Sequence, residues 1–340
     1  MRKVRSMLAA WAFVAATVLG PTCLAQDAPF YKNKKIILVM GFPPGGAFDT
    51  YGRIVARYWS KHIPGEPTII PENMPGAGNL KAAEYIYNKA SKDGLVVGLV
   101  SSGLTVSLFL APSAPRIDLR QFNWLGSANR QTVVALVWHT APVQTMADLK
   151  SHQLIVGAGG ANLEMLLRAA QKITDLNFKI IAGYNGTPDT KGAMEKGEIE
   201  GTILNYSSLE SGYQDVVRDK KVSILFQYGL TPTRELSSVP RLIELAETEQ
   251  QRQALRFLLS WQDLGLPFVA PPGVAKDRVE LLRTSFNEMV ADPAFVDEAR
   301  KRGLSVSPDD FPKGEDLKKS VDEVYATPPD VIEYVRNLGL

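Results

Sequence analysis

Two glycine-rich stretches of the chain have the residue types and the neighbours that anion binding requires. The first runs from Gly41 to Asp49 and follows the apolar run Ile36 to Met40. Glycines at the end of a strand let a ligand approach the backbone, and the helix start that follows offers free N–H groups and a positive dipole end. Such a site needs no lysine or arginine. The same spacing also fits a tight turn in which Asp49 only caps the helix.

The second stretch, Gly157 to Asn162, also follows an apolar run and opens a helical pattern. Taken alone, it is typical of ordinary turn chemistry. The two stretches together favour a site for a small dianionic ligand, because such a ligand needs hydrogen-bond donors at each end. Tyr184 and Asn205 follow two further apolar runs at comparable positions.

The motifs of nucleotide sites and of common hydrolases do not occur in the sequence. The first stretch matches neither G-x-x-x-x-G-K-[ST] nor G-x-G-x-x-G, which argues against a nucleotide or dinucleotide site. No G-x-S-x-G elbow, H-E-x-x-H motif or pair of carboxylates stands out. Three histidines and one cysteine leave little room for a zinc or iron site. We therefore predict no catalytic residue, no metal site and no cofactor.

Short apolar runs alternate with helical patterns along the chain, and this alternation defines the elements that must position the two stretches. Strands are expected at residues 36–40, 68–70, 95–100, 133–138, 153–156, 178–181, 202–204 and 222–226. Residues 51–59 have the spacing of an amphipathic helix, and the C-terminal helical pattern is interrupted at Pro328 and Pro329. The alternation predicts an α/β fold with mainly parallel sheets, in which two units with matched glycine loops form a cleft.

The length of 340 residues corresponds to about two domains at ~150 residues each. The first 25 residues have the pattern of a secretory signal peptide: basic Arg2, Lys3 and Arg5, an apolar run, and small residues before Gln26. A membrane anchor is disfavoured because the apolar run is shorter than the ~20 residues of a spanning helix. Cleavage after Ala25 would leave 35 basic and 36 acidic residues. This balance lacks the excess of basic residues that is typical of nucleic-acid-binding proteins.

Several motifs resemble those of one family, the Bug-type periplasmic substrate-binding proteins of tripartite tricarboxylate transporters. Phe42 to Asp49, with Arg53 after it, resembles the first signature of that family, and Glu72 to Gly78 resembles the second. Weaker similarities cover most of the remaining chain and lie at Asp93-Gly94, Gly157 to Leu163, Tyr184 to Thr187, Gly197 to Glu200 and Ala270 to Val274.

The resemblance implies a two-lobed, Venus-flytrap binding protein without enzymatic activity. Residues 26–130 and 264–340 would form the first lobe and residues 131–263 the second, with a hinge near residues 128–134 and 260–267. Backbone amides and waters of two facing loops would hold the ligand. The residues implied are Phe42, Pro44, Gly45, Gly46, Ala47 and Asp49 on one side, Gly159, Gly160, Ala161 and Asn162 on the other, and Tyr184 and Asn205 on the wall.

The expected function is capture of a small di- or tricarboxylate in the periplasm, by a monomer, and its delivery to the membrane permease subunits of the transporter. Two alternatives stay open: a sensor for a signalling kinase that uses the same site, and an enzyme on the same fold. Arg53 is expected to pair with Asp49 one helical turn away and not to reach the ligand. A valine at Gly46 is expected to block the ligand and to resist the backbone angle of that position.

Overall fold

The computed structural model describes residues 29–111, 117–231 and 235–340, and the signal-peptide prediction for residues 1–25 lies outside them. In the described part, the apolar runs form ten strands in two five-stranded sheets. The first sheet contains β1 (Lys35–Met40), β2 (Thr68–Asn73), β3 (Val96–Leu99), β4 (Asn123–Gly126) and β10 (Phe268–Ala270). The second contains β5 (Val133–Trp138), β6 (Leu154–Gly159), β7 (Phe178–Tyr184), β8 (Gly201–Asn205) and β9 (Val222–Gln227).

The two sheets have the same topology. Their strand orders are β2-β1-β3-β10-β4 and β7-β6-β8-β5-β9. In the first sheet β1 runs parallel to β2 and β3, and only β10 is reversed, antiparallel to both β3 and β4. In the second sheet β5 is the reversed strand, antiparallel to β8 and β9. Four strands of each sheet therefore point the same way, which confirms the predicted α/β class with mainly parallel sheets.

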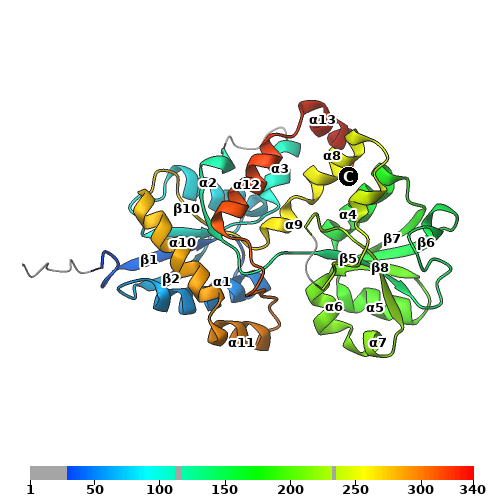
Figure 1. The fold of residues 1–340 in the computed structure, drawn as a ribbon, viewed down its shortest axis with the longest axis horizontal. Helices are drawn as coiled ribbons and strands as arrows, with labels where there is room; N and C mark the ends of the chain where they lie inside the picture. Colours follow the sequence, from blue (N-terminus) through cyan, green and yellow to red (C-terminus); the bar gives the residue numbers. More distant parts are fainter. Residues whose placement is uncertain (1–28, 112–116, 232–234) are drawn as a thin grey trace, which may run out of the picture.

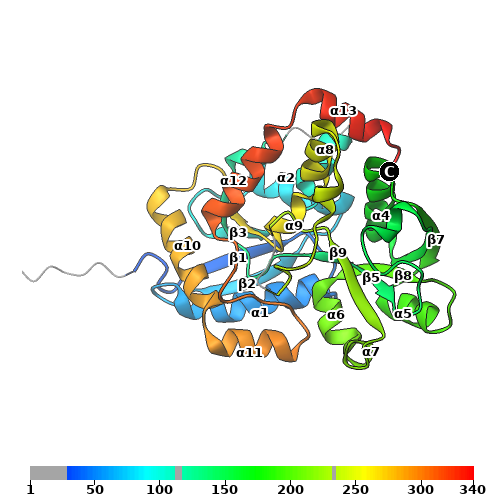
Figure 2. The ribbon, with the colours of Figure 1, turned by 45° about the vertical axis from the view of Figure 1, so that its right-hand side comes forward.

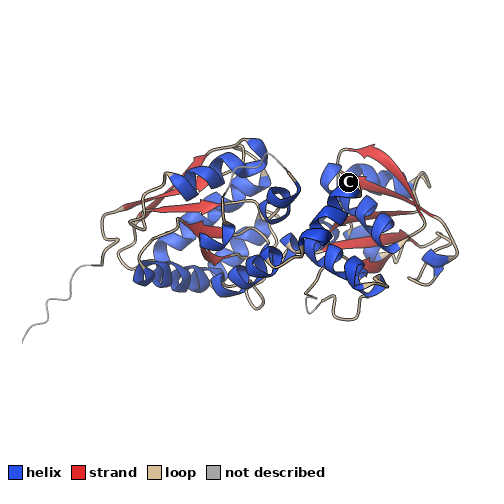
Figure 3. Cartoon of the chain, turned by 90° about the horizontal axis from the view of Figure 1, so that it is seen from above, coloured by secondary structure: helices blue, strands red, loops and turns tan. Residues whose placement is uncertain are grey.

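Helices cover both faces of each sheet, and each sheet with its helices forms one lobe (Figures 1 and 3). The α-helices are α1 (Ala47–His62), α2 (Leu80–Asn88), α3 (Leu104–Leu110), α4 (Ala161–Thr174), α5 (Thr187–Glu195), α6 (Tyr206–Gly212), α7 (Gln214–Arg218), α8 (Glu249–Leu259), α9 (Trp261–Leu264), α10 (Lys276–Val290), α11 (Pro293–Lys301), α12 (Gly314–Tyr325) and α13 (Pro329–Asn337). Short 3-10 turns lie at Ala77–Asn79, Leu119–Gln121, Asp148–Lys150 and Leu242–Leu245. In the described part of the chain, no helix is both long and apolar enough to span a bilayer.

The predicted apolar face of α1 anchors the first lobe. Ile54, Val55 and Trp59 of this face are buried. The Trp59 ring lies edge-on to Phe286 of α10 with 5.2 Å between centroids, and its Nε1 donates to Ser285 Oγ at 2.9 Å. Burial of one such large side chain stabilises the fold by about 1.5–3 kcal/mol, so α1 is held firmly against the sheet.

The chain crosses between the lobes in two segments that lie side by side. Leu266 N donates to Ser127 Oγ at 2.9 Å, and Val133 N donates to Gln262 Oε1 at 2.8 Å. Gly265 has a φ of +59°, and a Cβ there would lie 1.9 Å from a carbonyl oxygen of the first crossing. These contacts fall in or beside residues 128–134 and 260–267, the segments predicted to form the hinge.

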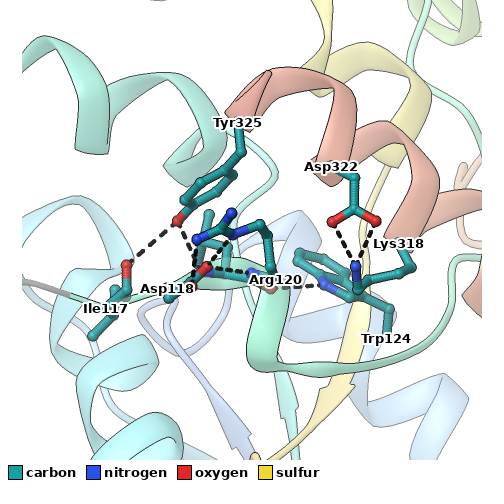
Figure 4. Close-up of polar contacts among 8 residues, drawn as sticks. Ile117, Asp118, Arg120, Trp124, Lys318, Asp322 and Tyr325 are labelled. Atoms are coloured by element: carbon teal, nitrogen blue, oxygen red, sulfur yellow. Dashed lines mark hydrogen bonds and ion pairs between the residues drawn. The ribbon is translucent and has the colours of Figure 1, made fainter. Parts of the chain in front are cut away.

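The last two helices pack on different parts of the molecule. Tyr325 of α12 fastens that helix to the first lobe: its hydroxyl accepts from Leu119 N at 2.9 Å, and the Arg120 guanidinium lies 4.5 Å from its ring centroid (Figure 4). Helix α13 instead packs on α8 (Figure 2) and also contacts α3. Lys172 Nζ of α4 donates to Leu338 O. The C-terminal helix thus reaches the second lobe, and the predicted lobe boundaries stay a prediction.

Candidate functional site

The first glycine loop, Gly41 to Asp49, ends in a helix start with free donors. Gly46 is the N-cap residue of α1 and provides no side-chain cap. Thr50 N makes the first bond of the helix, to Gly46 O at 2.9 Å. The backbone amides of residues 47–49 find no acceptor among the described residues. Three N–H groups and the positive end of the α1 dipole therefore converge at this point, which is the arrangement that binds an anion.

Asp49 holds the shape of this loop. Its buried carboxylate accepts hydrogen bonds from Gly45 N at 2.9 Å, from Arg53 Nε at 3.0 Å and from Asn73 Nδ2 at 2.8 Å. The bond from Arg53 is the main reason why the pKa of Asp49 is lowered to about 2, and the donors on Gly45 and Asn73 lower it further. Because these donors occupy the carboxylate, Asp49 positions the loop, and only its amide is open to a ligand.

Arg53 pairs locally, as predicted. Besides its bond to Asp49, its guanidinium donates to Asn73 Oδ1 at 2.9 Å. Asn73 Nδ2 also donates to Phe42 O at 2.9 Å, so this one side chain ties the loop to the end of β2. Sequence reasoning assigned no role to Asn73. The signal that could have found it is its place at the end of β2, opposite Met40 in the parallel register.

The expectation about the backbone at Gly46 is wrong. Gly46 has φ −83° and ψ 173°, an extended conformation that any residue adopts. The constrained position is Gly45, with φ +86°, where a residue with a side chain would be strained. A Cβ at Gly46 would have no atom within 4 Å, so it would point into open space.

The second glycine loop, Gly157 to Asn162, presents a similar set of donors in the second lobe. Gly160 is the N-cap of α4 with φ +114°, and it has no side-chain cap. Its carbonyl accepts from Glu164 N at 3.0 Å, while the amides of residues 162 and 163 have no acceptor in the part of the chain that the structure describes. A Cβ at Gly159 would lie 2.6 Å from the backbone carbon of Gly186, so this loop abuts the loop after β7.

Tyr184 and Asn205 lie at the ends of β7 and β8, on the same edge of the second sheet. Tyr184 is paired with Gly159 in the register, and its ring covers Gly157. Burial raises the pKa of its hydroxyl. Asn205 is the N-cap residue of α6 without a side-chain cap bond, and its Oδ1 is buried without a hydrogen-bond partner. An unmet buried acceptor costs about 1–3 kcal/mol, which a donor from a ligand or a water would relieve.

The predicted site residues therefore form two groups, one in each lobe. Both groups follow the carboxyl ends of parallel strands, where α/β sheets bind their ligands. Among residues 29–111, 117–231 and 235–340, no hydrogen bond, ion pair or ring contact joins the two groups. Figure 3 shows the lobes side by side.

The metal-ligand types, the histidines and two cavities of the described chain lie apart from the predicted site residues. No group of three His, Cys, Asp or Glu residues within it could hold a metal ion. His62 pairs with Asp292 at 3.2 Å, and His139 and His152 are exposed. A cavity of about 790 Å³ lies beside α8 and α12, and a second of about 470 Å³ lies beside α5 and α6. No predicted site residue lines either cavity.

Comparison of the sequence with those of known proteins identifies the family of this chain. The protein BugT of Bordetella pertussis is 31% identical over 296 residues, which cover 82% of this chain and 83% of BugT. The chain belongs to the Bug-type family of tripartite tricarboxylate transporter binding proteins. A UPF0065 protein from the tcbD-tcbE intergenic region of Pseudomonas sp. strain P51 is 24% identical over 86% of this chain and 85% of its own length. No family model matches the chain.

Solved structures agree with the fold of a Bug-type protein. A TctC solute-binding protein from Polaromonas superimposes with a TM-score of 0.68 at 18% identity, and the match covers 91% of this chain and 98% of that one. The periplasmic binding protein BugD gives a TM-score of 0.55 at 18% identity, covering 91% and 99% of the two chains. The predicted two-lobed periplasmic-binding-protein fold and the predicted family are both confirmed.

Proposed function

We propose that this Bug-type protein captures a small organic di- or tricarboxylate between its two lobes and delivers it to the permease subunits of a tripartite tricarboxylate transporter. Two similar structures from Rhodopseudomonas palustris, with TM-scores of 0.54 and 0.53, contain adipate and malate, and both ligands are dicarboxylates. Backbone amides and ordered waters supply the contacts. The protein acts as a monomer without a cofactor, and nucleic acid is not a partner.

One observation carries the proposal: each lobe has a helix start whose first-turn amides have no acceptor among the described residues. The donors at α1 and at α4 suit the two carboxylates of one ligand. A ligand that contacts both lobes favours the closed arrangement and shifts the population toward it, with the crossings at Ser127 and Gln262 as the hinge.

Two other roles would use the same site. A sensor would bind the same ligand and signal to a kinase, and a permease or kinase gene beside this one would distinguish the two. An enzyme would need a nucleophile and a base, and the candidate site holds no such pair among its described residues. Turnover of a carboxylate by the purified protein would favour the enzyme.

Export to the periplasm is part of the proposal, and it rests on the family and on the pattern of residues 1–25. Mass spectrometry of the secreted protein is expected to show an N-terminus at Gln26. A cytosolic protein that retains Met1 would contradict export.

A thermal-shift screen across mono-, di- and tricarboxylates tests ligand binding. A ligand at about 100 times its dissociation constant adds about 2.7 kcal/mol to the free energy of unfolding, so a true ligand raises the melting temperature clearly. Small-angle scattering with that ligand is expected to show a smaller radius of gyration. An unchanged radius with a bound ligand would contradict closure.

Two variants test the source of affinity. Gly46→Val keeps an allowed backbone conformation but places a branched side chain where the carboxylate must approach, so affinity is expected to fall tenfold or more, about 1.4 kcal/mol. Arg53→Gln removes a cation that is already paired and is expected to retain most of the affinity. Calorimetry measures both. The opposite result would replace the amide site with a side-chain clamp.

A further inference from the structure

An aromatic pair lies at the α1 side of the proposed ligand site. The rings of Phe42 and Phe48 are stacked, with 4.5 Å between centroids and 29° between planes. The Phe48 side chain is 38% exposed. Of the large apolar side chains in the described residues, only Phe30 and Val217 are exposed as well. The Phe30 ring is covered by the Arg278 guanidinium, 3.8 Å from its centroid, whereas the structure records only Phe42 as a ring partner of Phe48.

Phe48 lies at the start of α1, next to the free amides. Phe48 is the second residue of α1, and its own amide is one of the three free donors. Side chains of a helix tilt toward its N-terminus, so we expect the Phe48 ring to lie beside an anion bound at those amides. A carboxylate bound there would carry its carbon skeleton past the ring.

The rest of the loop surface is apolar and has no net charge. Pro43, Pro44 and Ala47 are exposed beside Phe48. The nearby charges, Asp49 and Arg53, neutralise each other in one ion pair. This surface suits one carboxylate followed by an apolar body. It offers no unpaired cation to a second carboxylate on the same end of the ligand.

We propose that the ligand is an aromatic carboxylate, whose ring stacks on Phe48 while a carboxylate binds the amides at the start of α1. This inference rests on the proposed function and narrows its substrate class. A second carboxylate on the far side of the ring would reach the donors of α4. Stacking of an aromatic ligand on an aromatic side chain adds to the affinity beyond what the buried area contributes.

Calorimetry with a matched pair of probes tests the class. Benzene-1,4-dicarboxylate and adipate both carry a carboxylate at each end, but only the first has a ring. The wild-type protein is expected to bind benzene-1,4-dicarboxylate about tenfold more tightly. Phe48→Ala is expected to remove this preference by weakening the aromatic ligand about tenfold and adipate less than twofold. Phe48→Leu, which keeps apolar area without a ring, is expected to lose most of the preference too.

Phe30→Ala is the matched control, because Phe30 is equally exposed and lies near Arg278, away from the glycine loop; it is expected to change neither affinity. A wild-type preference for adipate, or an equal loss of both ligands in Phe48→Ala, would overturn the inference. If adipate binds at least as tightly as benzene-1,4-dicarboxylate and Gly46→Val abolishes that binding, the proposed function stands while the aromatic class fails. If neither these two probes nor any carboxylate of the thermal-shift screen binds, both fail.

Discussion

The loop before α1 is held by side-chain hydrogen bonds, whereas the loop before α4 is held by contact between backbones. In the first loop, Asp49 gathers donors from Gly45, Arg53 and Asn73. In the second, Gly159 lies so close to Gly186 that no Cβ fits between them. Both loops present free amides at a helix start. Hydrogen bonds to a carboxylate position the amides of the first loop, and close backbone packing positions those of the second.

Because of this difference, the two loops are expected to respond differently to pH and to substitution. A loop held by a buried carboxylate depends on the ionisation of that group and on the identity of its partners. A loop held by close backbone contact is indifferent to pH but sensitive to a single added carbon. The following variants test this contrast.

The largest effect is expected from Gly159→Ala. Its Cβ would lie 2.6 Å from a backbone carbon of Gly186, which cannot turn aside as a flexible side chain would. We expect a loss of about 3 kcal/mol in the free energy of unfolding, measured by urea denaturation, together with weaker ligand binding. Gly46→Ala, where the added Cβ meets no atom within 4 Å, is the control and is expected to change stability by less than about 1 kcal/mol. Equal losses in both variants would contradict the contrast.

Asp49→Asn is expected to cost about 2 kcal/mol at pH 7, because it leaves several donors of the first loop with a weaker acceptor. Asp189 provides a matched control in the second lobe. Its Oδ2 accepts from Asn185 N at 3.1 Å, also four residues earlier, but the side chain is exposed. Asp189→Asn is expected to cost less than about 1 kcal/mol in the same urea experiment. A larger loss in Asp189→Asn would show that burial does not decide the effect.

The contribution of Asp49 is expected to depend on acidity. Its pKa is about 2 in the folded protein, whereas an aspartate without such partners has an ordinary pKa of 3.8. Because the pKa is lower in the folded state, the ionised carboxylate stabilises the fold at pH values above the pKa of the unfolded state. This stability is lost as the pH falls from about 4 through about 2. The stability difference between wild type and Asp49→Asn is therefore expected to shrink by about 1–2 kcal/mol between pH 5 and pH 2. A difference that stays constant over this range would contradict the lowered pKa.

The smallest effect is expected from Arg53→Gln, at about 0.5–1 kcal/mol. The Arg53 side chain is 47% exposed, so water screens its pair with Asp49 and replaces part of what is lost. Chemical denaturation at low and high salt measures this, and the loss should be smaller at high salt. A loss as large as that of Asp49→Asn would mean that the ion pair, and not the carboxylate's bonds to the loop, holds the first loop.

The sequence was sufficient where a local pattern decides the structure. The apolar runs predicted eight strands, and the spacing of residues 51–59 predicted the buried face of α1. The i,i+4 spacing of Asp49 and Arg53 likewise predicted their pairing. Each of these features depends on neighbours along the chain, which periodicity and spacing describe directly.

Other features depend on residues that meet only in the folded chain. Strands β4 and β10 were not predicted, because β4 (NWLG) contains Asn and Gly, which are uncommon in strands, and β10 lies between Pro267 and Pro271. The role of Asn73 follows from the register of β1 and β2. The strict need for glycine at position 159 follows from Gly186, 27 residues away. The free amides, by contrast, were predicted, beside the alternative in which Asp49 caps the helix, because a glycine-rich loop that leads into a helical pattern can be recognised in the sequence.

The placement of β10 between β3 and β4 sets an order of events during synthesis. β4 joins the first sheet only through β10, and Asn123 Nδ2 bonds to Pro271 O across 148 residues. All five strands of the second sheet lie between these two strands in the chain and leave the ribosome earlier than β10. A nascent chain therefore holds β3 with an unpaired edge until β10 emerges, and such edges favour association with other chains. The sheet that contains the N-terminal strand is the last to be completed.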